Sequence, residues 1–252
     1  MKFKPNEVQE LLKASYEKNK YDIDKFKIDS SLSGNRVKVY TVDNSKDVIV
    51  THRGSGNAQD WFDNAVWFKF NSLTLSKTYK MHLKKHKEAV KKYNAKNIIV
   101  MGHSRGGLYA KEIYDNKLVK QLITYNKPVN MYDIISNNVK SKKNDKNETV
   151  IRTSGDVVSS GQNFLKGNSS DVVIDSKTIN PLTEHNTDQL GNLKDDKLIG
   201  QGIFKRKIDF SKLRKSELKD FVKQNKKKLN LDINITGLTK KDYIIIIEQL
   251  LN

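Results

Sequence analysis

The chain has 252 residues, 36% of them apolar and 30% charged, so it is long enough and apolar enough to fold around a sizeable core rather than stay disordered. It contains no cysteine, which excludes disulfides and thiolate metal sites. The formal net charge of +18 favours polyanionic partners, either nucleic acid or an anionic membrane surface. The joint abundance of Lys, Asn and Ile has a second explanation, because an AT-rich genome encodes these residues without any selection for binding.

The N-terminal segment lacks the apolar core of a signal peptide. The longest apolar run, residues 244–247, is far too short to cross a bilayer. We therefore expect a soluble protein that resides inside a cell or in a virion.

Helices and strands are expected to alternate along the first 200 residues. The hydrophobic pattern predicts, in chain order, a helix over 7–18, strands over 37–42 and 47–51, a helix over 76–93, a strand over 97–101, a helix over 107–116, and strands over 122–125, 149–152 and 172–174. This alternation is typical of an α/β fold, with a mainly parallel sheet and right-handed crossovers.

The composition changes after residue 203. Residues 204–252 hold thirteen Lys and Arg against six Asp and Glu, and their leucine spacing predicts short helices. We therefore predict two domains, an α/β domain over 1–203 and a small basic helical domain over 204–252. The polar stretch 137–147 is interpreted as a surface loop and not as a domain boundary.

A candidate nucleophile lies in Gly102-His103-Ser104-Arg105-Gly106, a G-x-S-x-G motif between an apolar strand and a helix. A nucleophile elbow needs this context, because small residues allow a sharp turn that projects the serine hydroxyl clear of the sheet. The alternative is a glycine-rich turn without chemistry. The flanking strand and helix favour Ser104 as a catalytic nucleophile.

An activated serine needs a histidine base and an acid that orients it, and in this fold class they follow the serine in the order acid, histidine. His185 is the only one of five histidines that lies after Ser104. Asp156 is the preferred acid because it follows the predicted strand 149–152, at an edge where α/β sites are built. Asp171 and Asp175 remain alternatives.

Two further patterns have competing interpretations. His82 and His86 are spaced to share one helix face and to bind a metal, but no Glu completes an H-E-x-x-H motif, so we favour an ordinary surface helix. Residues 61–70 hold both tryptophans and three phenylalanines, which suits a lid over the site or a buried helix, and we favour the buried helix.

Several segments together resemble the class 3 lipases. These segments are 47–55, which ends in Arg-Gly-Ser, the Asp-Trp region 60–63, the elbow 102–107, the strand 122–128 that ends in proline, and 156–158 around the candidate acid. They cover roughly residues 35–190 in the order found in that family.

The resemblance implies an α/β-hydrolase fold that cleaves carboxylic esters through an acyl-enzyme, without a cofactor or metal. It also implies that Ser55 and the backbone N–H of Arg105 form the oxyanion hole. The chain departs from the family where Arg105 replaces the usual leucine and Val157 the usual proline, so a charged side chain is expected at the mouth of the site. The short spacing from acid to base argues against a standard triacylglycerol substrate.

The C-terminal region, about 211–252, resembles SAP-type modules, whose usual partner is DNA; a helical cap without a ligand is the alternative. A lipase-like domain with such a region and an AT-biased composition suggests a DNA virus or mobile element, with a phospholipase acting at a host membrane. The alternative function is a catalytically inactive hydrolase fold that binds DNA or membrane. Within enzymes, a peptidase or thioesterase remains open, because a triad does not specify the leaving group.

Overall fold

The computed structural model describes residues 1–55, 76–129, 147–156, 158–159, 172–176, 178, 181–193, 199–200, 215–216, 219 and 239–242. The chain divides into two compact units, Met1–Lys205 and Arg206–Asn252. In the second unit, residues 215–216, 219 and 240–242 are helical. The aromatic segment 61–70 and nearly all of the predicted loop 137–147 lie outside the described residues, as does most of the predicted C-terminal domain.

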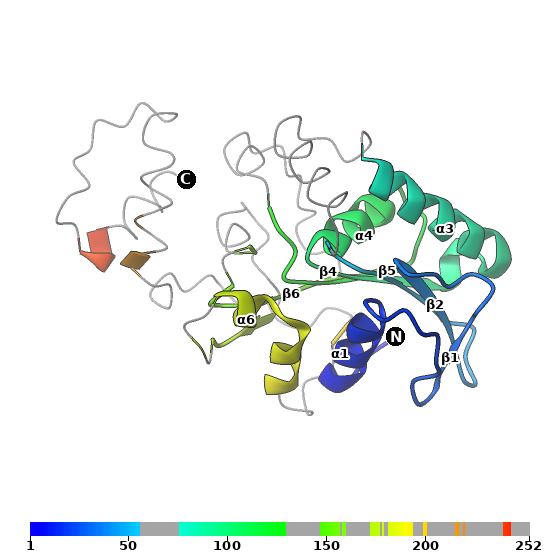
Figure 1. The fold of residues 1–252 in the computed structure, drawn as a ribbon, viewed down its shortest axis with the longest axis horizontal. Helices are drawn as coiled ribbons and strands as arrows, with labels where there is room; N and C mark the ends of the chain where they lie inside the picture. The colour runs from blue at the N-terminus through cyan, green and yellow to red at the C-terminus, as the bar shows by residue number, and fades with distance from the viewer. Residues whose placement is uncertain are drawn as a thin grey trace. The chain divides into compact units, whose positions relative to one another are not determined.

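A seven-stranded sheet forms the centre of the first unit (Figure 1). Its strands are β1 (Phe26–Ile28), β2 (Val37–Val42), β3 (Val48–His52), β4 (Ile98–His103), β5 (Gln121–Tyr125), β6 (Glu148–Thr153) and β7 (Val172–Ile174). They lie side by side in chain order; β1, β2 and β3 pair antiparallel, and β3 to β7 pair parallel. The predicted α/β class with a mainly parallel sheet is therefore confirmed. The three-residue β1 was not predicted: its sequence is Phe-Lys-Ile, whereas the equally short β7 is a run of β-branched residues, Val-Val-Ile.

Helices cover both faces of this sheet. They are α1 (Pro5–Ala14), α3 (Lys77–Tyr93), α4 (Arg105–Asp115), α6 (Pro181–His185) and the 3-10 helices η1 (Ala95–Asn97) and η3 (Thr187–Asn192). The Ser76 side chain caps α3 by accepting a hydrogen bond from the N–H of Tyr79. Helix α1 ends four residues earlier than predicted, where the Ser15 hydroxyl donates to the Leu12 carbonyl.

The sheet separates two hydrophobic cores. Side chains alternate along β4, so Ile98 and Val100 pack with α3 and α4, whereas Ile99 and Met101 pack with α1 and η3 on the opposite face. Figure 1 shows α3 and α4 on one side of the sheet and α1 on the other. Burial on both faces explains why β4 is apolar throughout its first four residues. A parallel sheet between helices, with a strand-turn-helix at its centre, is an α/β-hydrolase-like arrangement.

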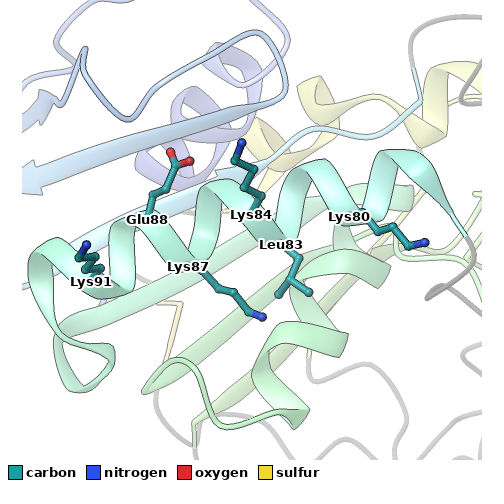
Figure 2. Close-up of a pocket in the computed structure, with 6 residues that line it drawn as sticks. All are labelled: Lys80, Leu83, Lys84, Lys87, Glu88 and Lys91. Carbon is teal, nitrogen blue, oxygen red and sulfur yellow. The ribbon is translucent and has the colours of Figure 1, made fainter.

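The outer face of α3 is strongly basic. Lys80, Lys84, Lys87 and Lys91 recur at helical spacing on exposed positions and, with Leu83 and Glu88, line a surface pocket (Figure 2). In the described part of the chain, no helix is both long and apolar enough to span a membrane.

Candidate active site

Ser104 lies in a strained turn between β4 and α4. Its backbone has φ 54° and ψ −131°, a region that residues with a side chain rarely occupy. Two hydrogen bonds hold this conformation: the Ser104 N–H donates to the Tyr125 carbonyl at 2.9 Å, and the Gly107 N–H donates to the Ser104 carbonyl at 2.9 Å. The turn predicted from the G-x-S-x-G motif therefore has the backbone geometry of a nucleophile elbow.

The two glycines of the motif are required by close backbone contacts. A Cβ atom on Gly102 would lie 2.2 Å from the Gly106 carbonyl oxygen, and one on Gly106 would lie 2.0 Å from the His52 carbonyl oxygen. Neither backbone atom has room to move without separating α4 from the sheet. The glycines thus allow α4 to start directly against β3 and β4.

Ser104 is partly exposed, whereas its neighbours in the chain are buried. Ser104 is the one partly exposed residue between Ile98 and Ala110, all the others being buried. It occupies the N-cap position of α4, yet its side chain makes no capping hydrogen bond. The serine is therefore positioned at the positive end of an eleven-residue helix, where a developing negative charge is stabilised.

His185 and Asp156 form a hydrogen-bonded pair. The distance from His185 Nδ1 to Asp156 Oδ1 is 3.0 Å, and Asp156 is fully buried. Because an ionised carboxylate only accepts hydrogen bonds, Nδ1 is the donor, which leaves Nε2 of neutral His185 as an acceptor. The pair joins the end of α6 to the loop that follows β6.

The carboxylate of Asp156 is stabilised in its ionised form. Burial by itself raises the pKa of this carboxyl, but hydrogen bonds from His185, Ser159 and Val158 outweigh burial and hold the pKa below its usual value. The backbone N–H groups of Val158 and Ser159 each donate to the carboxylate at 3.0 Å. Of the alternative acids, Asp175 is exposed at the end of β7, and Asp171 lies outside the described residues.

The segment predicted to hold an oxyanion donor runs beside the nucleophile. A Cβ atom on Gly54, the residue before Ser55, would lie 2.9 Å from the Cβ of Ser104. The backbone N–H of Arg105 belongs to the first residue of α4. The role of Ser55 and Arg105 as oxyanion donors stays a prediction.

The side chain of Arg105 does not lie at the mouth of the site. It is 3% exposed, and its guanidinium lies 5.5 Å from the centre of the Tyr109 ring, one helical turn further along α4. The expectation of a charged group at the mouth is therefore wrong. The guanidinium covers an aromatic ring instead.

His82 and His86 are buried, not on the surface as predicted. They are 1% and 0% exposed, and they pack with the fully buried His52 of β3. The Nδ1 atoms of His52 and His82 are 2.9 Å apart, and the rings of His52 and His86 stack with their centres 5.6 Å apart. Among the described residues, no group of three or more His, Asp or Glu side chains is arranged to hold a metal ion.

Sequence reasoning missed two residues close to the base and the elbow, His103 and Tyr16. His103 is the variable residue of the G-x-S-x-G motif, and its ring centre lies 4.9 Å from that of His185. Its Nδ1 atom lies 2.7 Å from the Tyr16 hydroxyl. Tyr16 precedes the elbow by more than 80 residues, so no local pattern links the two side chains.

Comparison with known proteins adds a similarity to solved structures at the level of the fold. No protein-family model matches the chain, and no curated protein sequence matches it. Among solved structures, the chain is similar to the Lip2 lipase of Yarrowia lipolytica, with 16% sequence identity and a TM-score of 0.41, over 77% of this chain and 82% of that one. The assignment to an α/β-hydrolase-like fold rests on the sheet order and the elbow described above.

Proposed function

We propose that this protein is a serine esterase that forms an acyl-enzyme on Ser104, with His185 as base and Asp156 as the orienting acid. The observation that carries the proposal is the His185–Asp156 hydrogen bond of 3.0 Å to a fully buried carboxylate. His103, the residue before the serine in elbow geometry, lies with its ring centre 4.9 Å from that of His185. An exposed ion pair of this kind contributes little to stability. A buried carboxylate without a partner is costly, so the buried Asp156 needs the hydrogen bond from His185. The class 3 lipase resemblance supports the same three residues.

The reaction follows from the chemistry of these groups. Ser104 Oγ attacks the ester carbonyl carbon while Nε2 of His185 takes the hydroxyl proton, and Asp156 stabilises the resulting imidazolium. The backbone N–H groups of Ser55 and Arg105 donate to the oxyanion of the tetrahedral intermediate. His185 then returns the proton to the leaving alcohol, and water, activated in the same way, releases the acid from the acyl-enzyme.

We further propose that the ester belongs to a lipid, and that the enzyme works at an anionic membrane surface. The net charge of +18 and the basic face of α3, formed by Lys80, Lys84, Lys87 and Lys91, support this choice, because anionic headgroups attract clustered lysines. This proposal uses no cofactor and no metal, since serine ester hydrolysis needs neither.

The test uses a fluorophosphonate probe, which reacts only with an activated serine, together with a panel of p-nitrophenyl esters and phospholipids. The full chain should be labelled and should hydrolyse at least the short esters. Ser104→Ala should abolish both, and Ser45→Ala, at an exposed turn remote from the elbow in sequence, should change neither. Absence of labelling in the intact protein would overturn the proposal and favour a catalytically inactive fold that binds polyanions.

A further inference from the structure

A partly buried hydrogen-bonded chain connects the candidate base to the segment that carries Ser55. We infer that Tyr16 and His103 are positioning residues, and this inference rests on the proposed function. Together they form a bridge that fixes the backbone of His185 relative to that of Gly54. Neither residue touches the reacting atoms in this role. The bridge sets the distance between the group that moves the proton and the segment that holds the oxyanion.

The contacts of the bridge are continuous. The Gly54 N–H donates to the Tyr16 hydroxyl oxygen at 2.9 Å, and that hydroxyl lies 2.7 Å from Nδ1 of His103. On the other side of the ring, Nε2 of His103 lies 2.7 Å from the backbone carbonyl oxygen of His185. Three hydrogen bonds therefore join residues 54 and 185, which are far apart in the sequence.

The direction of every hydrogen bond in the bridge is determined. The His185 carbonyl only accepts, so Nε2 of His103 carries a proton and donates it. Burial, together with the nearby His185, lowers the pKa of His103 to about 3, so the ring is neutral and Nδ1 is an acceptor. The Tyr16 hydroxyl must then donate to Nδ1, which leaves its oxygen free to accept from Gly54.

Packing restricts the bridge to one arrangement. His103 is 6% exposed, and its ring lies between those of His185 and Tyr125, with centres 4.9 Å and 5.5 Å away. The carbonyl of His185 also accepts a hydrogen bond from the Asn126 side chain at 3.2 Å. The backbone of the base is thus held by two donors from buried side chains.

A neutral His103 also suits the reaction electrostatically. His185 becomes a cation in the transition state, and a second cation with its ring centre 4.9 Å away would oppose that charge. The bridge keeps the Nε2–H tautomer of His103, which supplies a donor without a charge. A positioning role predicts that loss of the bridge lowers kcat, because small displacements of catalytic groups reduce rates by factors up to about 100.

The test compares Tyr16→Phe, which removes one oxygen atom and keeps the ring, with Tyr21→Phe at an exposed tyrosine. We expect Tyr16→Phe to lower kcat by about 10- to 100-fold with little change in KM or in melting temperature. His103→Leu should lower kcat by at least as much, and the double variant should be no worse than His103→Leu alone, because both changes break one bridge. Tyr21→Phe should match the unaltered protein in every measurement.

A second measurement does not depend on activity. The ¹⁵N chemical shifts of His103 in the full chain report its tautomer, and we expect protonation at Nε2 only, with the Nδ1 signal shifting in Tyr16→Phe. An Nδ1–H tautomer, or an unchanged kcat in Tyr16→Phe, would overturn the bridge. A protein that shows this tautomer but is not labelled by a fluorophosphonate would keep the bridge and refute the proposed esterase function.

Discussion

At the scale of single residues, the geometry of the elbow depends on the absence of two side chains. A methyl group on Gly106 would meet the His52 carbonyl oxygen at 2.0 Å, and backbone cannot move aside cheaply. We predict that Gly106→Ala lowers the free energy of unfolding by about 2 kcal/mol or more, measured by urea denaturation. Gly34→Ala is the matched control, because nothing lies within 4 Å of the added carbon there, and equal effects at the two sites would contradict the close contact.

The role assigned to Asp156 can be separated from its effect on folding. Asp156→Asn keeps the size of the side chain but no longer favours the Nδ1–H tautomer of His185, so we predict a fall in kcat on the order of 10³ to 10⁴. Asp175→Asn should leave kcat unchanged, because Asp175 is exposed. Equal activity of the two variants in a p-nitrophenyl ester assay would show that another acid orients the base.

Ser55 offers either its hydroxyl or only its backbone N–H to the oxyanion. If the hydroxyl participates, Ser55→Ala should lower kcat by a factor of about 10 to 10³, with KM nearly constant, because the interaction exists only once the oxyanion forms. Steady-state kinetics on a soluble ester measure both constants. An unchanged kcat would restrict Ser55 to its backbone role.

The residues that sequence reasoning found share one property. Ser104 belongs to a local motif, His185 is the only histidine after it, and Asp156 follows an apolar strand, so each has a signal in its own segment. Tyr16 has no such signal, and His103 occupies the motif position at which any residue is allowed. Their interaction forms across 87 positions, and only the docking of the chain after α1 against the elbow brings the two rings together.

At the scale of secondary-structure elements, the helical period of α3 shows why its histidines were misjudged. The buried positions include Tyr79, His82, His86 and Ala89, a stripe with the spacing of a helix that packs on a sheet. Lysines occupy so many of the other positions of α3 that the two histidines were also interpreted as exposed polar residues. The strands were predicted more accurately, and 37–42 and 172–174 match β2 and β7 residue for residue, because runs of β-branched residues there are short and bounded by polar residues.

The contact between β3 and α3 should make the fold sensitive to acid. Burial lowers the pKa of His52 well below its usual value and that of His86 to about 4. Between these values and about 6.5, the unfolded chain binds protons that the folded chain does not, so stability falls as the pH falls. We predict a loss of about 1.4 kcal/mol per pH unit for each histidine between about pH 6 and pH 4.5.

Urea denaturation at a series of pH values measures this dependence. His86→Leu should reduce the slope of the free energy of unfolding against pH by the contribution of one histidine, because leucine does not titrate. Exposed Lys84→Gln on the same helix should leave the slope unchanged, since lysine keeps its charge throughout this range. An identical slope in His86→Leu would show that His86 is not the source of the acid sensitivity.

At the scale of the whole molecule, the proposed catalytic residues belong to one unit, whereas the positive charge is shared by both units. Ser104, Asp156, His185 and both bridge residues belong to the unit Met1–Lys205. Residues 206–252 hold twelve Lys and Arg against six Asp and Glu, so the first unit keeps +12 of the net charge of +18. A chain that ends at Lys205 therefore loses no proposed catalytic group but loses a third of the net charge.

We predict that this shortened chain hydrolyses a soluble ester at the rate of the full chain. Its affinity for DNA should fall, with a shallower dependence on salt, because fewer lysines displace counterions from the phosphates. Binding to anionic vesicles should persist in part and weaken further when Lys80, Lys84 and Lys87 on the basic face of α3 are changed to glutamine. Titrations of both chains at two salt concentrations decide the matter: an inactive shortened chain would make residues 206–252 part of the hydrolase fold, and unchanged DNA affinity would exclude them as the nucleic-acid-binding segment.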